Sequence, residues 1–156
     1  MSAIHVLLDE YAESHRNGTN KTIHWICVPA IMISLIGLLW SIPVPLLFEM
    51  VPYPMNLGIL FVLTAMLYYF LLSPRLALGM VLISFLFLWI VYQLEQISGV
   101  PLWATSLFIF VLAWIGQFVG HKIEGKKPSF LKDLQFLLIG PVWLLSFIYQ
   151  KLGISF

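Results

Sequence analysis

Four long stretches of the chain contain no charged residue, and they constrain the fold more than any other feature. They cover residues 25–42, 57–72, 76–94 and 102–119. Each approaches the length of about 20 residues that a helix needs to cross about 30 Å of hydrocarbon. Hydrophobic residues make up 61% of the 156 residues and charged residues 10%, which is more apolar sequence than one soluble core can bury. We predict an all-α integral membrane protein with four spanning helices in a single domain, residues 1–156.

Proline and glycine separate the four stretches. Pro43 and Pro45 follow the first stretch, Pro74 follows the second, and Gly99 and Pro101 follow the third. These residues end helices. Because the links are short, we expect successive helices to pack antiparallel.

A fifth apolar stretch, residues 134–149, is shorter and contains Gly140-Pro141 near its middle. Proline in a helix interior removes a hydrogen bond and clashes with the preceding turn. The stretch is therefore expected to kink, to re-enter the membrane or to span it.

The positive residues alternate between the loops and predict the orientation. They occur before the first stretch, between the second and third, and after the fourth, at Arg16, Lys21, Arg75, Lys122, Lys126, Lys127 and Lys132. Lysine and arginine favour the cytoplasmic side. We expect a cytoplasmic N-terminus, in a bacterial inner membrane or an endoplasmic reticulum membrane. The formal net charge of +1 gives no electrostatic reason to expect a nucleic-acid partner.

Residues 1–20 are predicted to form an interfacial helix and a turn. Apolar side chains recur at helical spacing from Ile4 to Tyr11. Asn17-Gly18 is typical of a helix end, and Asn20 of the cap of the next helix. We therefore expect His15 in the last turn of one helix and His24 in the first turns of the next.

Three of the four histidines, His15, His24 and His121, lie where apolar stretches meet charged sequence. The predicted orientation places all three at the cytoplasmic face. Histidine is a common neutral ligand for transition metals, and ionisable groups at a membrane boundary are functional candidates. The chain has one cysteine, Cys27, which excludes a cysteine-rich metal site and is expected to be a small wall residue. The pattern predicts a metal site.

Three further residues have open assignments. Glu124 follows His121 by three positions and is a candidate fourth ligand or base, or the partner of a neighbouring lysine in a surface ion pair. His5 lies about 80° from His15 on a helical wheel and is expected to face solvent, with an auxiliary ligand as the alternative. Tyr11 lies one turn before His15, where it could orient that ring or anchor the helix at the interface. The six tryptophans predict an aromatic belt.

The number of histidines limits the type of metal site. Membrane di-iron hydroxylases resemble a scaffold with eight or more clustered histidines, whereas this chain has four, none adjacent. A mononuclear site with Fe(II) or zinc fits the count. The sequence lacks H-E-x-x-H, G-x-S-x-G, P-loop and dinucleotide-binding motifs.

Two blocks of the sequence, residues 11–29 and 114–141, resemble the membrane family of 2-hydroxy fatty acid dioxygenases, typified by a fungal endoplasmic reticulum enzyme of phytosphingosine breakdown. The blocks contain Tyr11, His15, Asn17, Asn20, His24 and Pro29, and Gln117, Gly120, His121, Glu124 and Pro128. Gly18 departs from the proline of many relatives, and the spacing from His121 to Glu124 is one residue shorter than in the fungal form. His5 has no counterpart.

The resemblance implies an Fe(II)-dependent α-oxidation, in which a 2-hydroxy fatty acid and dioxygen give a fatty acid one carbon shorter. By position it implies that His15, His24 and His121 bind the metal, with Glu124, His5 or no protein group as the fourth ligand. Residues expected to support the ligands or contact the substrate are Tyr11, Asn17, Asn20, Lys21, Gln117 and Glu124. Two other functions stay open: a zinc-dependent membrane lipid hydrolase, and a small membrane transporter or organising protein.

Overall fold

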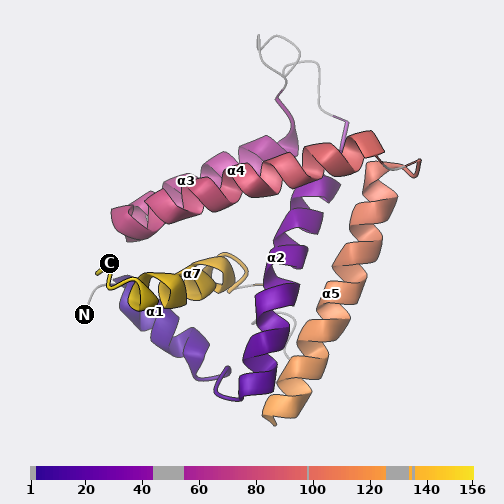
Figure 1. Ribbon diagram of the computed structural model, residues 1–156. Coiled ribbons are helices and arrows are strands. Elements are labelled where there is room, and N and C mark those ends of the chain that lie inside the picture. Colours follow the sequence, from indigo (N-terminus) through magenta and orange to yellow (C-terminus); the bar gives the residue numbers. More distant parts are fainter. Residues whose placement is uncertain (1–2, 44–54, 98, 126–133, 135) are drawn as a thin grey trace.

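The computed structural model describes residues 3–43, 55–97, 99–125, 134 and 136–156, and all the regular structure in this part of the chain is helical. The prediction of an all-α fold is confirmed. Predicted features outside the described residues include Pro45, Lys126, Lys127, Pro128 and Lys132. The helices are α1 (Ala3–Ala12), α2 (Gly18–Trp40), α3 (Leu57–Leu72), α4 (Pro74–Ile97), α5 (Leu102–Glu124) and α7 (Ile139–Lys151) (Figure 1).

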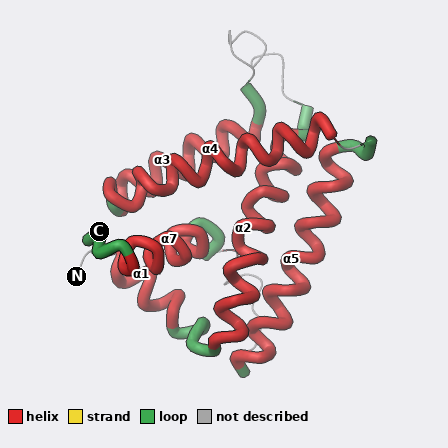
Figure 2. The backbone as a smooth tube through the Cα atoms, viewed as in Figure 1, coloured by secondary structure: helices red, strands yellow, loops and turns green. Residues whose placement is uncertain are grey.

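The helices form two pairs that diverge from a shared corner (Figure 1 and Figure 2). Antiparallel α2 and α5 form one pair, and the α3–α4 hairpin forms the other. At the corner, α3 begins beside α2, where the position of a Cβ on Gly58 lies 2.9 Å from the Ile36 carbonyl oxygen. Helices α1 and α7 lie in the angle between the two pairs.

Small residues allow α2 and α5 to approach closely. An added Cβ at Gly116 would lie 2.6 Å from Cys27 Sγ, and Cβ atoms at Gly37 and Gly120 would meet Ser106 and Asn20. Between helices in lipid, van der Waals packing of this kind replaces the hydrophobic drive that operates in water. The antiparallel contact brings the start of α2 and the end of α5 to one level.

The structure corrects the predicted ends of the first two helices. Helix α1 ends at Ala12, and α2 begins at Gly18. Asn17, rather than Asn20, is the N-cap, because its side-chain oxygen accepts hydrogen bonds from the backbone N–H groups of Thr19 (2.8 Å) and Asn20 (3.3 Å). His15 therefore lies in the connection between the helices instead of the last turn of α1.

Among the described residues, three helices are long and apolar enough to cross a membrane: α2, α4 and α5, with 23, 24 and 23 residues. This length is compatible with the predicted membrane protein. Helix α3 is more apolar than these three but has 16 residues, which rise about 24 Å, less than the usual hydrocarbon thickness. The fourth span therefore stays a prediction.

The fifth apolar stretch begins its helix later than the sequence indicated. Helix α7 starts at Ile139, so Gly140-Pro141 lies in its first turn, where a backbone N–H has no partner within the helix. Proline therefore does not interrupt the middle of the helix. With 13 residues, α7 rises about 20 Å, which favours the re-entrant alternative over a complete span.

Hydrogen bonds and apolar packing fix α7 against the α3–α4 hairpin. The Tyr69 hydroxyl donates to the Leu138 carbonyl oxygen (2.7 Å), and the Tyr149 hydroxyl donates to the Arg75 carbonyl oxygen (2.9 Å). Trp143, 3% exposed, lies in the same core cluster as residues of α1, α3 and α4. The hairpin thereby holds one face of α7 towards α1 and the connection that carries His15.

The close contact between α2 and α5 leads to a first prediction. Gly37→Ala places a methyl group against Ser106, so we expect the free energy of unfolding to fall by about 1–3 kcal/mol. Gly18→Ala is the matched control, because no atom lies within 4 Å of its Cβ position. Unfolding of both variants in detergent micelles measures the difference, and equal stability would contradict the packing.

Candidate metal centre

Three histidines from two distant parts of the sequence meet at one point. His15 lies in the α1–α2 connection, His24 near the start of α2, and His121 near the end of α5. Their nearest ligand nitrogens all lie within 4.8 Å of one another. The ring centroids of His15 and His24 are 4.3 Å apart, and His121 lies 5.2 and 5.1 Å from them. Imidazole nitrogens bound to one metal ion lie at about 2 Å from it, so small adjustments suffice to close this group around an ion.

All three rings are buried. Their exposed fractions are 3% for His15, 0% for His24 and 4% for His121. Buried polar groups cost free energy unless hydrogen bonds or a metal compensate for lost water. The geometry therefore requires specific partners for each ring.

The ring nitrogens of His15 and His24 reveal their tautomers. Nδ1 of His15 lies 2.6 Å from the Tyr11 carbonyl oxygen, and Nδ1 of His24 lies 3.0 Å from the Asn20 carbonyl oxygen. A carbonyl accepts only, so each Nδ1 donates a proton, and in the neutral ring each Nε2 then carries a lone pair. These two Nε2 atoms face each other at 2.9 Å. Two lone pairs at this distance repel unless a proton or a metal cation lies between them.

Glu124 lies outside the three-histidine group and binds the connection that carries His15. Its Oε1 accepts from the Arg16 backbone N–H (2.9 Å), and its Oε2 accepts from the Asn17 backbone N–H (2.9 Å) and the Asn20 side-chain amide (3.0 Å). The same amide donates to the Ser14 carbonyl oxygen at 3.2 Å. Glu124, Asn17 and Asn20 therefore join the end of α5 to both sides of His15. Whether Glu124 also binds a metal stays a prediction.

Aromatic rings enclose His15 on its other side. Tyr11 stacks on the His15 ring, with centroids 4.2 Å apart and planes at 14°. Trp143 lies 5.2 Å from both His15 and Tyr11. The aromatic-belt prediction is wrong for Trp143 and Trp114, which are 3% and 6% exposed. Nothing in the sequence distinguishes Trp143 from a belt residue, because its place near His15 depends on how α7 packs.

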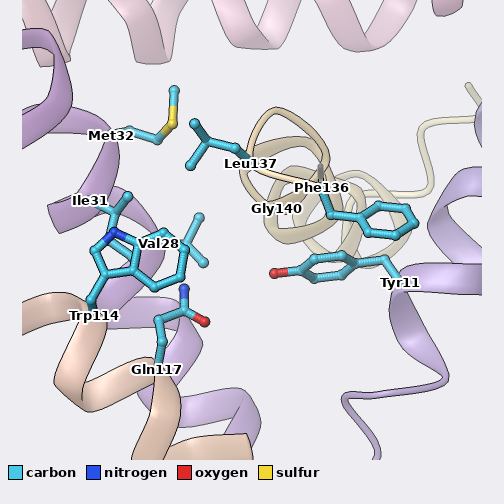
Figure 3. Close-up of a pocket in the computed structure, with 9 residues that line it drawn as sticks. All are labelled: Tyr11, Val28, Ile31, Met32, Trp114, Gln117, Phe136, Leu137 and Gly140. Atoms are coloured by element: carbon cyan, nitrogen blue, oxygen red, sulfur yellow. The ribbon is translucent and has the colours of Figure 1, made fainter. Parts of the chain in front are cut away.

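A small cavity lies one helical turn from the histidines (Figure 3). Tyr11 precedes His15 by four residues, Val28 follows His24 by four, and Gln117 precedes His121 by four; all three line the cavity. Its volume of about 20 Å³ can hold one water-sized molecule. In Figure 3 the Tyr11 hydroxyl and the Gln117 amide point into it from opposite sides, between apolar side chains. Both groups are placed to contact a small molecule in this cavity.

Two predicted residues do not belong to the three-histidine group. The Lys21 ammonium lies 5.9 Å from the centroid of the Phe147 ring of α7. His5 stacks on Phe156 with centroids 5.5 Å apart, near the start of α1. The expectation that His5 lies outside the core site agrees with this position.

Comparison with known proteins identifies the family. A family model described as 2-hydroxy-palmitic acid dioxygenase Mpo1-like matches residues 1–152. The chain belongs to this family. The 2-hydroxy-palmitic acid dioxygenase MPO1 of Saccharomyces cerevisiae is 28% identical over 145 residues, which cover 92% of this chain and 78% of the yeast protein. No solved structure matches.

Membership of the Mpo1-like family confirms the resemblance found in the two sequence blocks. The first block supplies His15 and His24, and the second supplies His121 and Glu124. The family model covers both blocks and every described helix up to Lys151. The Mpo1-like family also supports an oxidoreductase, since the yeast relative is a dioxygenase.

The contacts of Glu124 lead to a second prediction for this Mpo1-like chain. Glu124→Ala removes the acceptor for three N–H groups around His15, so we expect metal affinity to fall about 10-fold or more. Glu124→Gln keeps one acceptor oxygen and should have an intermediate effect. Titration with a metal-competing chelator measures the affinity. Glu95→Ala, which removes an exposed carboxylate at the far end of α4, is the control. Unchanged affinity in Glu124→Ala would contradict the positioning role.

Proposed function

We propose that this chain is an Fe(II)-dependent dioxygenase that shortens 2-hydroxy fatty acids by one carbon, at the cytoplasmic face of the membrane. One observation supports metal binding most directly. The Nε2 atoms of His15 and His24 lie 2.9 Å apart, and both Nδ1 atoms are directed at carbonyl oxygens. A metal cation relieves the repulsion between these lone pairs. His121 would supply a third nitrogen.

The choice of iron rests on chemistry. Three neutral imidazoles leave coordination positions for substrate and dioxygen, an arrangement that suits non-haem Fe(II). Zinc fits the same ligands but has no redox chemistry, so it cannot reduce dioxygen. The name of the yeast relative, a 2-hydroxy-palmitic acid dioxygenase, supports the redox-active metal.

The proposed reaction balances without an external reductant. The bond between the carboxyl carbon and the 2-hydroxy carbon breaks, the hydroxy carbon becomes the new carboxyl group, and the old carboxyl carbon leaves as carbon dioxide. The electrons lost by the substrate reduce dioxygen. The products are the shortened fatty acid, one carbon dioxide and one water, and together they contain both oxygen atoms of dioxygen. When bound, iron would supply the electron transfer between the two substrates.

The protein's own residues have distinct tasks in this proposal. His15, His24 and His121 hold the metal, and Glu124 with Asn17 and Asn20 fixes the connection that carries His15. Tyr11 and Trp143 cover His15 and exclude bulk water. The Tyr11 hydroxyl and the Gln117 amide can donate hydrogen bonds to a ligand in the small cavity.

The cytoplasmic location follows from charge. Arg16 and Lys21 flank the start of α2, and Lys122 lies near the end of α5, so positive residues gather at the end of the α2–α5 pair that carries the histidines. The excess of lysine and arginine favours the cytoplasmic side.

The metal assignment gives a third prediction. We expect one iron ion per chain in protein purified without chelators, and its loss in His24→Ala and His121→Ala, because two ligands hold the ion less well than three. His5→Ala should keep the metal, since His5 stacks on Phe156 outside the site. Elemental analysis measures the metal, and an oxygen electrode measures consumption with 2-hydroxypalmitic acid. Turnover in the absence of oxygen, or full activity without bound metal, would contradict the proposal.

The small cavity gives a fourth prediction. Tyr11→Phe and Gln117→Leu remove the polar groups that point into it, so we expect kcat to fall about 100-fold, as for the loss of one donor to a developing negative charge. Metal content should not change, because neither side chain belongs to the histidine group. Gln93→Leu, at the opposite end of the bundle, is the control. Loss of iron in these variants would instead assign both residues to folding of the site.

A further inference from the structure

A second, larger hollow lies between α2, α4 and α7. Its volume is about 250 Å³, and apolar side chains line it, among them Trp25, Pro29, Leu86, Phe87, Leu144 and Ile148. Trp25, Leu86 and Ile148 are 42%, 51% and 42% exposed, so the groove is open along one side. On helices of this length and hydropathy, that side faces the lipid. A hydrophobic molecule dissolved in the bilayer can therefore enter sideways.

The groove has a direction. Trp25 lies 6.4 Å from Phe147, the neighbour of Ile148, and these residues mark one end. Phe87 packs in one cluster with Met32 and Ile36 of α2, further from the start of that helix, and marks the other end. The groove thus runs from the first turns of α2 towards the middle of the bundle.

A positive charge lies at the outer end. Lys21, Trp25 and Pro29 are spaced by four residues and share one stripe of α2. The Lys21 ammonium lies 5.9 Å from the centroid of the Phe147 ring, directly beside the end marked by Trp25. The stripe therefore changes from cationic to apolar along its length. A fatty acid in one leaflet has the matching order, with its carboxylate at the membrane surface and its apolar tail deeper in the bilayer.

The outer end also lies near the histidines. His24 directly precedes Trp25, and Lys21 lies three residues before His24, on the neighbouring turn. Phe147 packs edge-on against Trp143 at 4.8 Å, and Trp143 lies 5.2 Å from His15. Two aromatic rings separate the groove from the metal centre.

We propose that this groove binds the hydrocarbon tail of the 2-hydroxy fatty acid, and that Lys21 binds its carboxylate. The proposal rests on the proposed function. It places the carboxylate at Lys21 and the adjacent 2-hydroxy carbon at the outer end of the groove, beside the turn of α2 that carries His24, while the tail follows Trp25 and Pro29 towards Leu86. The acyl chain thereby sets which carbon lies nearest the histidines, and Lys21 distinguishes a free fatty acid from an esterified one.

Chain-length preference tests the groove. Leu86→Trp fills its inner end, and Leu86 is exposed enough to accept a larger ring. Loss of room for about two methylene groups should weaken binding of long 2-hydroxy fatty acids about 10-fold and leave shorter ones unaffected. Leu82→Trp is the matched control, one turn earlier on α4, with Leu82 72% exposed and outside the groove. Ile148→Trp blocks the outer end and should weaken all chain lengths.

Substitutions that remove or keep the positive charge of Lys21 test its proposed contact with the carboxylate. Lys21→Gln should raise KM for 2-hydroxypalmitic acid about 10-fold, as expected for the loss of a charge-assisted contact, while metal content stays constant. Lys21→Arg should retain the wild-type KM. Equal KM in wild type and Lys21→Gln would overturn the assignment of the carboxylate.

A binding measurement separates this proposal from the proposed function. Displacement of a fluorescent fatty acid from the full chain in nanodiscs reports binding without turnover. A long-chain defect in Leu86→Trp but not Leu82→Trp supports the groove even if the protein consumes no oxygen. Oxygen consumption with an unchanged chain-length preference in Leu86→Trp overturns the groove and leaves the proposed function standing. Displacement by phospholipid as effective as by 2-hydroxypalmitic acid assigns the groove to bilayer lipid and also overturns the proposal.

Discussion

The close antiparallel contact between α2 and α5 is the constraint on which the rest of the structure depends. Lipid tails are as apolar as leucine, so two helices gain little from burying leucines against each other and gain more from short contact distances. Glycines at Gly37, Gly116 and Gly120 provide that short distance. Because the helices are antiparallel, the same contact sets His24 and His121 at one level, and a shift of one turn would separate them by about 5 Å.

Burial of the three histidines costs free energy of folding. Burial of three imidazoles removes their hydration, and the backbone acceptors of His15 and His24 direct both Nε2 lone pairs at each other. Apolar side chains would pack there without this burial cost, and the 2.9 Å approach of the two nitrogens fits a proton or a metal cation held between them. The Asn20 side-chain amide, which donates to both Ser14 and Glu124, holds the connection that carries His15 in place.

The sequence predicted what depends on local pattern and left out what depends on packing. Apolar length indicated the long helices, and the alternation of positive charges predicted a common face for three histidines, whose rings lie together in the structure. The cap was misassigned because Asn17 and Asn20 both suit a helix start, and only their contacts show that Asn17 caps while Asn20 reaches Ser14 and Glu124. Trp143 was missed because its neighbours are equally apolar. Its role follows from the angle of α7, which sequence spacing does not specify.

Because α7 is short, it covers part of the histidine site and still leaves a groove open beside α2. A helix that fully crossed the bilayer would fill the angle between the two helix pairs and close the space beside α2. With 13 residues, α7 occupies only part of that angle, so its inward residues cover His15 while its outer face leaves an apolar groove along Trp25 and Pro29. A water-soluble enzyme would need a lid to shield such a groove. Under the proposed function the bilayer would serve as the apolar surround, and a substrate dissolved in it would need to move only sideways to enter the groove.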